Sequence, residues 1–282
     1  MKNEQQTEQN RYDFSSEQCV NLCNEDLTEC KNLILPQNMN IVCLTSVKLP
    51  VGEYDFSTAK QASITYTDLS RATKLILPKD INYLNMRRTV FPAGEYDFSG
   101  VKTLDLFYAD LSRATKVILP KNANIINLKG TILPAGEYDL SNVNDLNLKH
   151  SDLSKATRII LPKSAKYINI KHTILPVGEY DFSDVKHLRA SDTNLNNAKL
   201  VILPKNAKYI DLSYTALPVG EYDLSDVKEF YFKYTDFSRA TKLKLPKSAN
   251  YIKLIHTKLP QSHSLFNRIK QRVNQITTQK IH

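Results

Sequence analysis

Aromatic and basic side chains recur at regular intervals along this chain, at positions that a short strand would point outward. The mean interval is about 21 residues, and the recurring types are Tyr, Phe, Arg, Lys and His. Tyrosine and arginine combine a large contact area with hydrogen-bonding groups, so they are enriched among protein-binding hot spots. The pattern predicts a partner-binding surface, which we call the aromatic-basic stripe. Its residues are Tyr83, Arg87, Arg88, Phe107, Tyr108, Lys129, Lys149, His150, Tyr167, Lys171, His172, Arg189, Tyr209, Tyr214, Tyr231, Lys233 and Tyr234.

No residue pattern in the chain indicates catalysis. There is no glycine-rich phosphate loop, no H-E-x-x-H and no G-x-S-x-G, and the six histidines keep no fixed relation to a nucleophile. The repeated string G-E-Y-D offers an alternative, a ladder of catalytic carboxylates such as Glu137 and Asp139. Residues that are identical in every repeat serve what every repeat needs, which is folding. We therefore expect a protein that is not an enzyme, with no catalytic residue, metal or cofactor.

The elements that position the stripe follow from an internal repeat. "LPVGEYDFS" begins at Leu49, and close copies begin at the same spacing at Phe91, Leu133, Leu175 and Leu217. All 12 prolines keep the same frame, two per repeat. A fixed period of about 42 residues is the signature of a solenoid, in which each repeat packs only on its neighbours.

Each of these repeats divides into two coils of about 21 residues. Apolar residues alternate in "DLNLKHSDLS" from Asp145 and in "YINIKHTILP" from Tyr167, which predicts a strand with one buried face. The G-E-Y-D string would return along the opposite side, with Tyr138 and Leu140 facing inward and Glu137 and Asp139 facing outward. We predict a mainly β, right-handed solenoid of about twelve coils with a parallel sheet.

The combined pattern L-x-x-L-x-L-x-x-(T/S)-x-L resembles the leucine-rich repeat family over about residues 12–260. The stretches "ILPKxAxxI" look like the BspA-like bacterial branch of that family. The chain departs from the family by placing Thr or Ser, as at Thr131 and Ser151, in the column that usually holds Asn. A hydroxyl group can take over part of the hydrogen bonding of that Asn. A pentapeptide-repeat helix is the alternative, because "ADLSRA" fits one of its turns, but the five-residue period is missing.

Three regions are expected along the chain. Residues 1–11 form a polar N-terminal tail, residues 12–260 form the solenoid, and residues 261–282 form a basic amphipathic helix. That helix would cap the last coil, with a partner-binding or membrane-surface helix as the alternative. The N-terminus shows no signal peptide, and no run is long enough to span a membrane, so the expected location is cytoplasmic, or outside after leaderless export.

All four cysteines lie in the first repeat. The register places Cys30 in the core and points Cys19, Cys23 and Cys43 outward. Cys23 and Cys43 would lie on neighbouring strands with an offset of two residues, too far apart for a disulfide. A zinc site is the alternative, although the spacing is C-x3-C and no histidine precedes His150.

The net charge of +9 is compatible with an acidic protein partner, an anionic membrane or nucleic acid, and most of it with a merely solvated surface. We expect a non-catalytic protein-recognition scaffold that binds an acidic protein through the aromatic-basic stripe. The resemblance to leucine-rich repeats implies the same role, and its bacterial branch implies an effector that acts in a host. Nucleic acid or an anionic membrane, bound through the same stripe, is the alternative.

Overall fold

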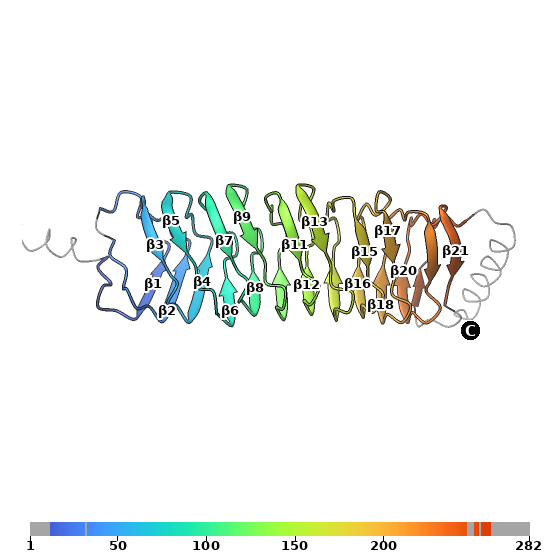
Figure 1. Cartoon of the computed structure of the whole chain (residues 1–282), viewed down its shortest axis with the longest axis horizontal. Coiled ribbons are helices and arrows are strands. Elements are labelled where there is room, and N and C mark those ends of the chain that lie inside the picture. Colours follow the sequence, from blue (N-terminus) through green and yellow to red (C-terminus); the bar gives the residue numbers. More distant parts are fainter. Residues whose placement is uncertain (1–11, 32, 247–250, 254, 261–282) are drawn as a thin grey trace, which may run out of the picture. The chain divides into compact units, whose positions relative to one another are not determined.

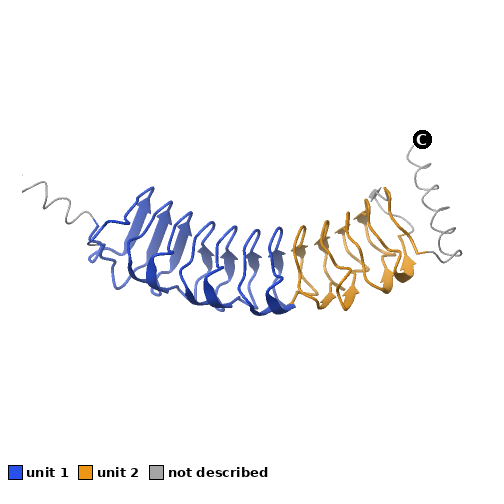
Figure 2. Cartoon of the chain, turned by 90° about the horizontal axis from the view of Figure 1, so that it is seen from above, with its two compact units in different colours: residues 1–159 blue, residues 160–282 orange. Residues whose placement is uncertain are grey.

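The computed structural model describes residues 12–31, 33–246, 251–253 and 255–260. The chain forms two compact units, residues 1–159 and 160–282, which are coloured separately in Figure 2. Both units are built from parallel strands wound as a β-solenoid, and no helix occurs among the described residues (Figure 1). The predicted C-terminal cap and the predicted N-terminal tail both lie outside the described residues.

One parallel strand per coil builds the main sheet layer of each unit. In the first unit these strands are β1 (Cys19–Cys23), β2 (Ile41–Thr45), β4 (Gln61–Thr65), β6 (Tyr83–Asn85), β8 (Thr103–Asp105), β10 (Ile125–Asn127) and β12 (Asp145–Asn147). In the second unit they are β14 (Tyr167–Asn169), β16 (His187–Arg189), β18 (Tyr209–Asp211), β20 (Glu229–Tyr231) and β22 (Tyr251–Lys253). One coil runs from each main-sheet strand to the next. The twelve described strands therefore define eleven complete coils, within one of the expected number of about twelve.

The return side of each coil also carries strands, but they pair only two by two. The pairs in the first unit are β3 (Gly52–Asp55) with β5 (Ala72–Ile76), β7 (Gly94–Asp97) with β9 (Ala114–Ile118), and β11 (Gly136–Asp139) with β13 (Ala156–Ile160). In the second unit β15 (Glu179–Asp181) pairs with β17 (Leu200–Ile202), and β19 (Gly220–Asp223) with β21 (Ala240–Lys244). Two alternating corner sequences therefore give one return sheet for every pair of coils.

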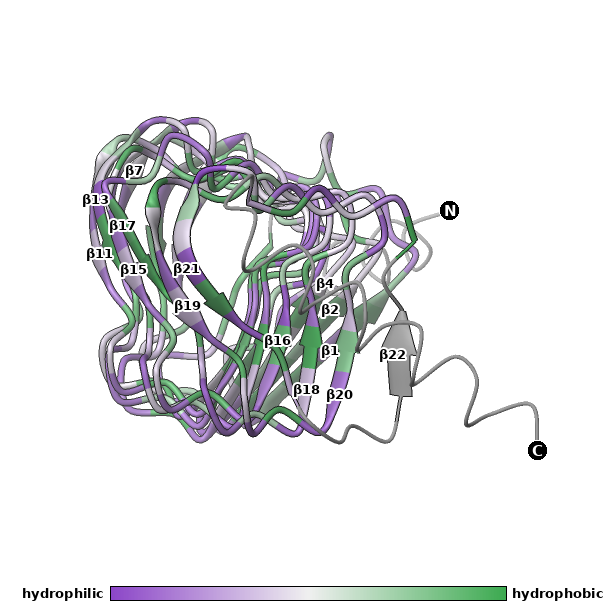
Figure 3. Ribbon diagram, turned by 90° about the vertical axis from the view of Figure 1, so that its right-hand side faces the viewer, coloured by the Kyte–Doolittle hydropathy of each residue, from purple (hydrophilic) through white to green (hydrophobic). Residues whose placement is uncertain are grey.

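The core lies between the two strand layers, as a view along the first unit shows, with β7, β11 and β13 on one side and β2 and β4 on the other (Figure 3). Leu146 and Leu148 face it from the main sheet, and Tyr138 and Leu140 face it from the return side, all of them buried. Glu137 is exposed and Asp139 is half-buried. The predicted inward and outward assignment of the G-E-Y-D string is confirmed.

A hydrogen bond within each corner explains the glycine of that string. The buried Tyr54 hydroxyl donates to the Pro50 carbonyl oxygen at 2.7 Å, four residues back. Tyr96, Tyr138, Tyr180 and Tyr222 repeat the same bond. A Cβ added to Gly52 would lie 3.3 Å from the Tyr54 hydroxyl oxygen, so a residue without a side chain gives that hydroxyl its room.

The column of threonine and serine hydroxyls joins successive coils. Thr131 Oγ1 donates to the Leu106 carbonyl oxygen at 2.6 Å, and Ser151 Oγ donates to the Leu128 carbonyl oxygen at 2.5 Å. Both residues are buried. Each buried hydroxyl thus finds a hydrogen-bond partner in the preceding coil, at a carbonyl oxygen that also accepts a backbone N–H.

The cysteines follow the prediction with one correction. Cys19 and Cys23 are exposed, and Cys43 lies opposite Asn21, offset by two residues from each of them. Cys30 is half-exposed instead of belonging to the core. Among the described residues of this first repeat, a bridge joins Asp13 and Ile34 on the return side.

Candidate partner-binding surface

All seventeen residues of the aromatic-basic stripe are accessible at the surface of the two units. The exposed ones are Tyr83, Arg88, Tyr108, His150, Arg189, Tyr214 and Tyr234. The half-buried ones are Arg87, Phe107, Lys129, Lys149, Tyr167, Lys171, His172, Tyr209, Tyr231 and Lys233. The structure therefore leaves every predicted residue able to touch a partner.

One position in each coil has a left-handed backbone, directly after the main strand. We call it the corner column, and its φ angles lie between +52° and +67°. It consists of Asn24, Ser46, Tyr66, Arg88, Tyr108, Gly130, His150, His172, Asp192, Tyr214, Tyr234 and His256. This conformation costs an L-residue roughly 1–2 kcal/mol, and Gly, Asn and Asp adopt it most readily. Tyr, His and Arg nevertheless fill most of the column.

In the first unit, cations and aromatic rings interleave along neighbouring coils. The Arg88 guanidinium lies 5.4 Å from the Tyr66 ring centroid and 5.5 Å from that of Tyr108. The Arg87 guanidinium lies 4.6 Å from the Phe107 centroid, and the Lys129 ammonium lies 4.9 Å from the same centroid. Separations of this size allow a cation–π attraction.

In the second unit, aromatic rings stack on one another. Tyr214 and Tyr234 have centroids 5.2 Å apart at an interplanar angle of 24°, and Tyr234 and His256 are 4.7 Å apart at 15°. The Lys233 ammonium lies 5.5 Å from the centroids of both tyrosines. Its hydrogen bond with the Tyr214 hydroxyl raises the pKa of Lys233, so this cation keeps its charge at neutral pH.

A second group of the second unit lies on the strands themselves. The Arg189 guanidinium lies 5.8 Å from the Tyr167 centroid and 5.4 Å from that of Tyr209, and the Tyr209 and Tyr231 centroids are 5.3 Å apart. Burial raises the pKa of Tyr209 to about 12, so its hydroxyl remains a hydrogen-bond donor throughout the physiological range.

These contacts decide which parts of the rings meet a partner. The faces of Tyr214 and Tyr234 lie toward each other, and the Arg88 guanidinium lies at the faces of Tyr66 and Tyr108. The ring edges and hydroxyl groups remain for external contacts, together with the cations. The surface can donate hydrogen bonds and attract anionic groups.

One residue that contacts the stripe escaped the sequence-based prediction. Tyr66, 55% exposed, belongs to the same corner column as Arg88 and Tyr108 and touches Arg88. Its position one coil before Arg88 would have revealed it. His256, which shares its column in the sequence with His150 and His172, stacks on Tyr234. The prediction grouped residues by their position in each coil, whereas the structure shows which of them touch across coils.

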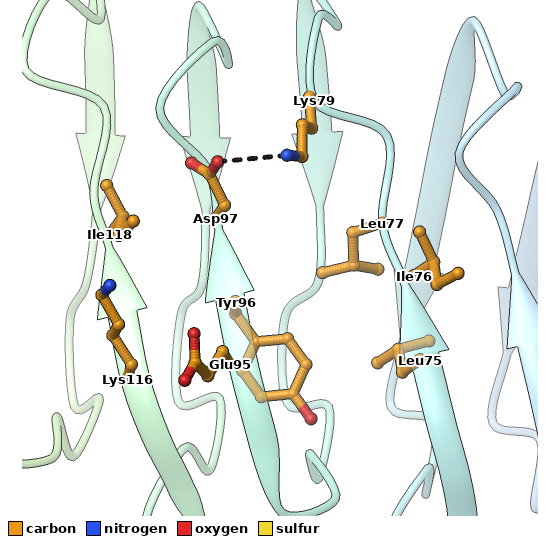
Figure 4. A pocket seen from close by; sticks show the side chains of 9 residues that line it. All are labelled: Leu75, Ile76, Leu77, Lys79, Glu95, Tyr96, Asp97, Lys116 and Ile118. Atoms are coloured by element: carbon orange, nitrogen blue, oxygen red, sulfur yellow. Dashed lines mark ion pairs between the residues drawn. The ribbon is translucent and has the colours of Figure 1, made fainter.

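The return side of the first unit carries a separate cavity of about 340 Å³ near β5, β7 and β9 (Figure 4). Figure 4 shows Glu95 and Asp97 between Leu75, Ile76 and Leu77 on one side and Lys116 and Ile118 on the other. The Lys79 ammonium lies 3.4 Å from an Asp97 carboxylate oxygen. Most of these residues recur in the other repeats, so the cavity reflects the common fold.

Neither a metal site nor a membrane-spanning element was found in the part of the chain that the structure describes. No cluster of three or more His, Cys, Asp or Glu residues with suitable geometry occurs there. Within the same residues, no helix has the length and apolar character needed to cross a membrane. No protein-family model, curated protein or solved structure matches this chain.

Proposed function

We propose that the chain is a non-catalytic recognition scaffold that binds a protein partner through the aromatic-basic stripe. The partner presents carboxylate groups, which meet Arg88, Arg189 and Lys233 and accept hydrogen bonds from the tyrosine hydroxyls. The aromatic edges between these cations supply apolar contact area. This combination of aromatic and arginine contacts is typical of binding hot spots.

The corner column carries the proposal. Its left-handed backbone would be least costly with Gly, Asn or Asp, yet Tyr66, Arg88, Tyr108, Tyr214 and Tyr234 occupy it and remain exposed. Residues held in sparsely populated backbone regions concentrate at functional sites. The contacts of these side chains with one another join neighbouring coils, and their exposed edges and charges add a surface that a partner can bind.

The ring stacking disfavours the nucleic-acid alternative. Single-stranded nucleic acid binds mainly by stacking bases on open aromatic faces. Tyr234 has one face against Tyr214 and the other against His256, so this stack leaves neither face of Tyr234 open to a base. The same residues can meet a protein through their edges and hydroxyl groups.

The membership in the leucine-rich repeat family, the right-handed winding and a role as a bacterial effector belong to the same proposal. The hydroxyl column supports the family likeness, because Thr131 and Thr215 bind carbonyl oxygens of the preceding coil. These bonds do the work for which the family uses Asn.

The experiment compares two variants of the full chain in capture from a cell extract, followed by quantitative binding to the captured partner. The stripe variant carries Arg88→Ser, Tyr108→Ser, Tyr214→Ser and Tyr234→Ser. The matched control removes exposed cations and apolar residues from the return side, with Lys74→Ser, Ile118→Ser, Ile202→Ser and Lys242→Ser.

We expect the stripe variant to lose the partner and the control variant to keep it. Binding is then measured against salt. A nucleic-acid partner loses affinity steeply, in proportion to the phosphates contacted, whereas a protein anchored by tyrosines loses much less. Equal binding by the stripe variant and the unmodified chain contradicts the proposal.

A further inference from the structure

One corner of the second unit departs from the repeat. Five of the six equivalent positions hold an Asp that forms a bridge with a neighbouring coil: Asp26, Asp68, Asp110, Asp152 and Asp236. The sixth is Asn194, which forms no such bridge. The Asn194 side chain still accepts a hydrogen bond from the Asn196 amide at 3.1 Å, so the turn itself is kept while the contact between coils is lost.

A second change lies three residues further on. Arg71 and Arg113 each donate to a backbone oxygen 43 residues earlier, Thr28 and Ser70, at 3.5 Å. The equivalent residue here is Asn197, whose side chain is shorter. The return strand is also shorter at this corner, because β17 begins at Leu200 whereas β9 begins at Ala114, the equivalent of Ala198.

These departures open a cavity of about 480 Å³ at the corner. Leu175 and Ala198, which line it, are half-exposed. Their equivalents inside the solenoid are buried: Leu49, Phe91, Leu133 and Leu217 for the first, and Ala72, Ala114, Ala156 and Ala240 for the second. Only at the ends of the described solenoid are the equivalents half-exposed, at Leu259 and Cys30. The cavity therefore uncovers apolar surface that the other internal repeats bury. Ser191, which precedes the lining residue Asp192, has a buried hydroxyl without a hydrogen-bond partner among the described residues.

The lining determines what the cavity can hold. Leu175, Pro176 and Ala198 give an apolar floor, and Asn194 and Asn197 lie among the polar residues. His172 Nδ1 lies 2.8 Å from Asp192 Oδ2 at the same site. No Lys or Arg lines the cavity, which disfavours a phosphate or another small anion.

A sugar is disfavoured as well. The only Phe, Tyr or Trp residue in the lining is Tyr180, whose ring is buried and whose hydroxyl donates to the Pro176 carbonyl oxygen. A carboxamide both donates and accepts, as the peptide backbone does, so two Asn side chains above an apolar floor suit an extended peptide.

We propose that this cavity binds an extended peptide segment of the partner, with an aliphatic side chain on the apolar floor and its backbone hydrogen-bonded by Asn194 and Asn197. Asp192 accepts a further N–H from the same segment. The inference rests on the proposed function, because His172 belongs both to the aromatic-basic stripe and to the cavity wall. A partner held on the stripe thus reaches the cavity without leaving the surface.

The test pans a phage library of random dodecapeptides against the full chain and against two variants. The repair variant carries Asn194→Asp and Asn197→Arg. These substitutions restore the residue types found at the equivalent positions Asp110 and Arg113. The control variant carries Asn144→Asp and Asn142→Arg, the same substitutions at exposed positions of the first unit. Melting temperatures establish that both variants fold. If the repair variant does not fold, Asn197→Arg alone replaces it.

We expect the unmodified chain and the control to enrich peptides that share an aliphatic residue, and synthetic copies to bind the repair variant at least about tenfold more weakly. Enrichment of the same peptides by the repair variant, or no enrichment by any chain, overturns the inference. If the stripe variant loses the partner while the repair variant keeps both partner and peptides, only the cavity is refuted. If the stripe variant keeps the partner and the repair variant loses the peptides, only the stripe is refuted.

Discussion

The ring of Tyr108 lies over Gly130, its counterpart in the next coil. A Cβ added to Gly130 would come within 2.4 Å of Tyr108 Cε1, closer than real Cβ contacts allow. Gly130 also has the left-handed φ of +67°. The one glycine of the corner column is thus required both by its own backbone and by the neighbouring ring.

Gly130→Ala should destabilise the chain by about 1–2 kcal/mol, because alanine is disfavoured in the left-handed region. It should also push the Tyr108 ring aside and weaken partner binding. Chemical denaturation measures the first effect. In a Tyr108→Ser background the clash with the ring is absent, so Gly130→Ala should cost less stability there. A double-mutant cycle without coupling between the two substitutions would show that the Tyr108 ring does not lie against Gly130.

At position 214, glycine should stabilise the fold more than alanine does. In an ordinary strand the order is reversed, but the left-handed φ of +59° favours Gly. We expect Tyr214→Gly to exceed Tyr214→Ala in stability by about 1 kcal/mol, while both lose partner binding. Thermal unfolding of the two variants measures the difference, and a more stable alanine variant would show that the corner is not left-handed.

Thr131→Val should cost about 1 kcal/mol, since it removes the buried hydrogen bond to the Leu106 carbonyl oxygen while keeping the shape. Thr115→Val is the matched control. Thr115 Oγ1 donates to the Gly94 carbonyl oxygen at 3.1 Å, but the residue is exposed, so the cost should stay below about 0.5 kcal/mol. Equal costs at the two sites argue against a structural role for the hydroxyl column.

The five buried tyrosines of the G-E-Y-D strings should make the stability of the fold sensitive to alkali. Burial raises the pKa of Tyr54, Tyr96, Tyr138, Tyr180 and Tyr222 from 10.0 to about 12. Above pH 10 the unfolded chain therefore binds fewer protons than the folded chain. The free energy of unfolding is unaffected below pH 10 and falls as the pH rises to 12.

Denaturant titrations between pH 8 and 12, with tyrosinate absorbance recorded in parallel, measure this loss of stability. Tyr138→Phe removes one of the five groups and should make the pH dependence less steep. A fold whose stability is constant to pH 12 contradicts the burial of these hydroxyl groups.

The four cysteines should titrate as free thiols in the native protein without added reductant. Cys43 lies opposite Asn21, so Cys19 and Cys23 are each displaced by two residues along the neighbouring strand. That offset exceeds the Cα separation of a disulfide. A native mass that is two hydrogens below that of the reduced protein, and that rises by two hydrogens on reduction, would reveal a disulfide and refute the register.

Sequence and structure agree best on features that every repeat shares. Tyr138 and Leu140 could be assigned to the core because alternation within a strand fixes which side chains share a face. Cys30 was assigned to the core by register with the later repeats, but it is half-exposed. Averages over repeats do not describe a terminal coil.

The sequence by itself determined the period, the parallel strands, the inward columns and the accessible stripe, because each follows from spacing within one coil. Only the tertiary structure decided that Arg88 lies between Tyr66 and Tyr108, that Tyr234 stacks on His256, and that the corner at Asn194 opens. The partners in these ring contacts lie a full coil apart in the chain. The winding of one coil on the next brings them into contact, and no local pattern encodes that distance.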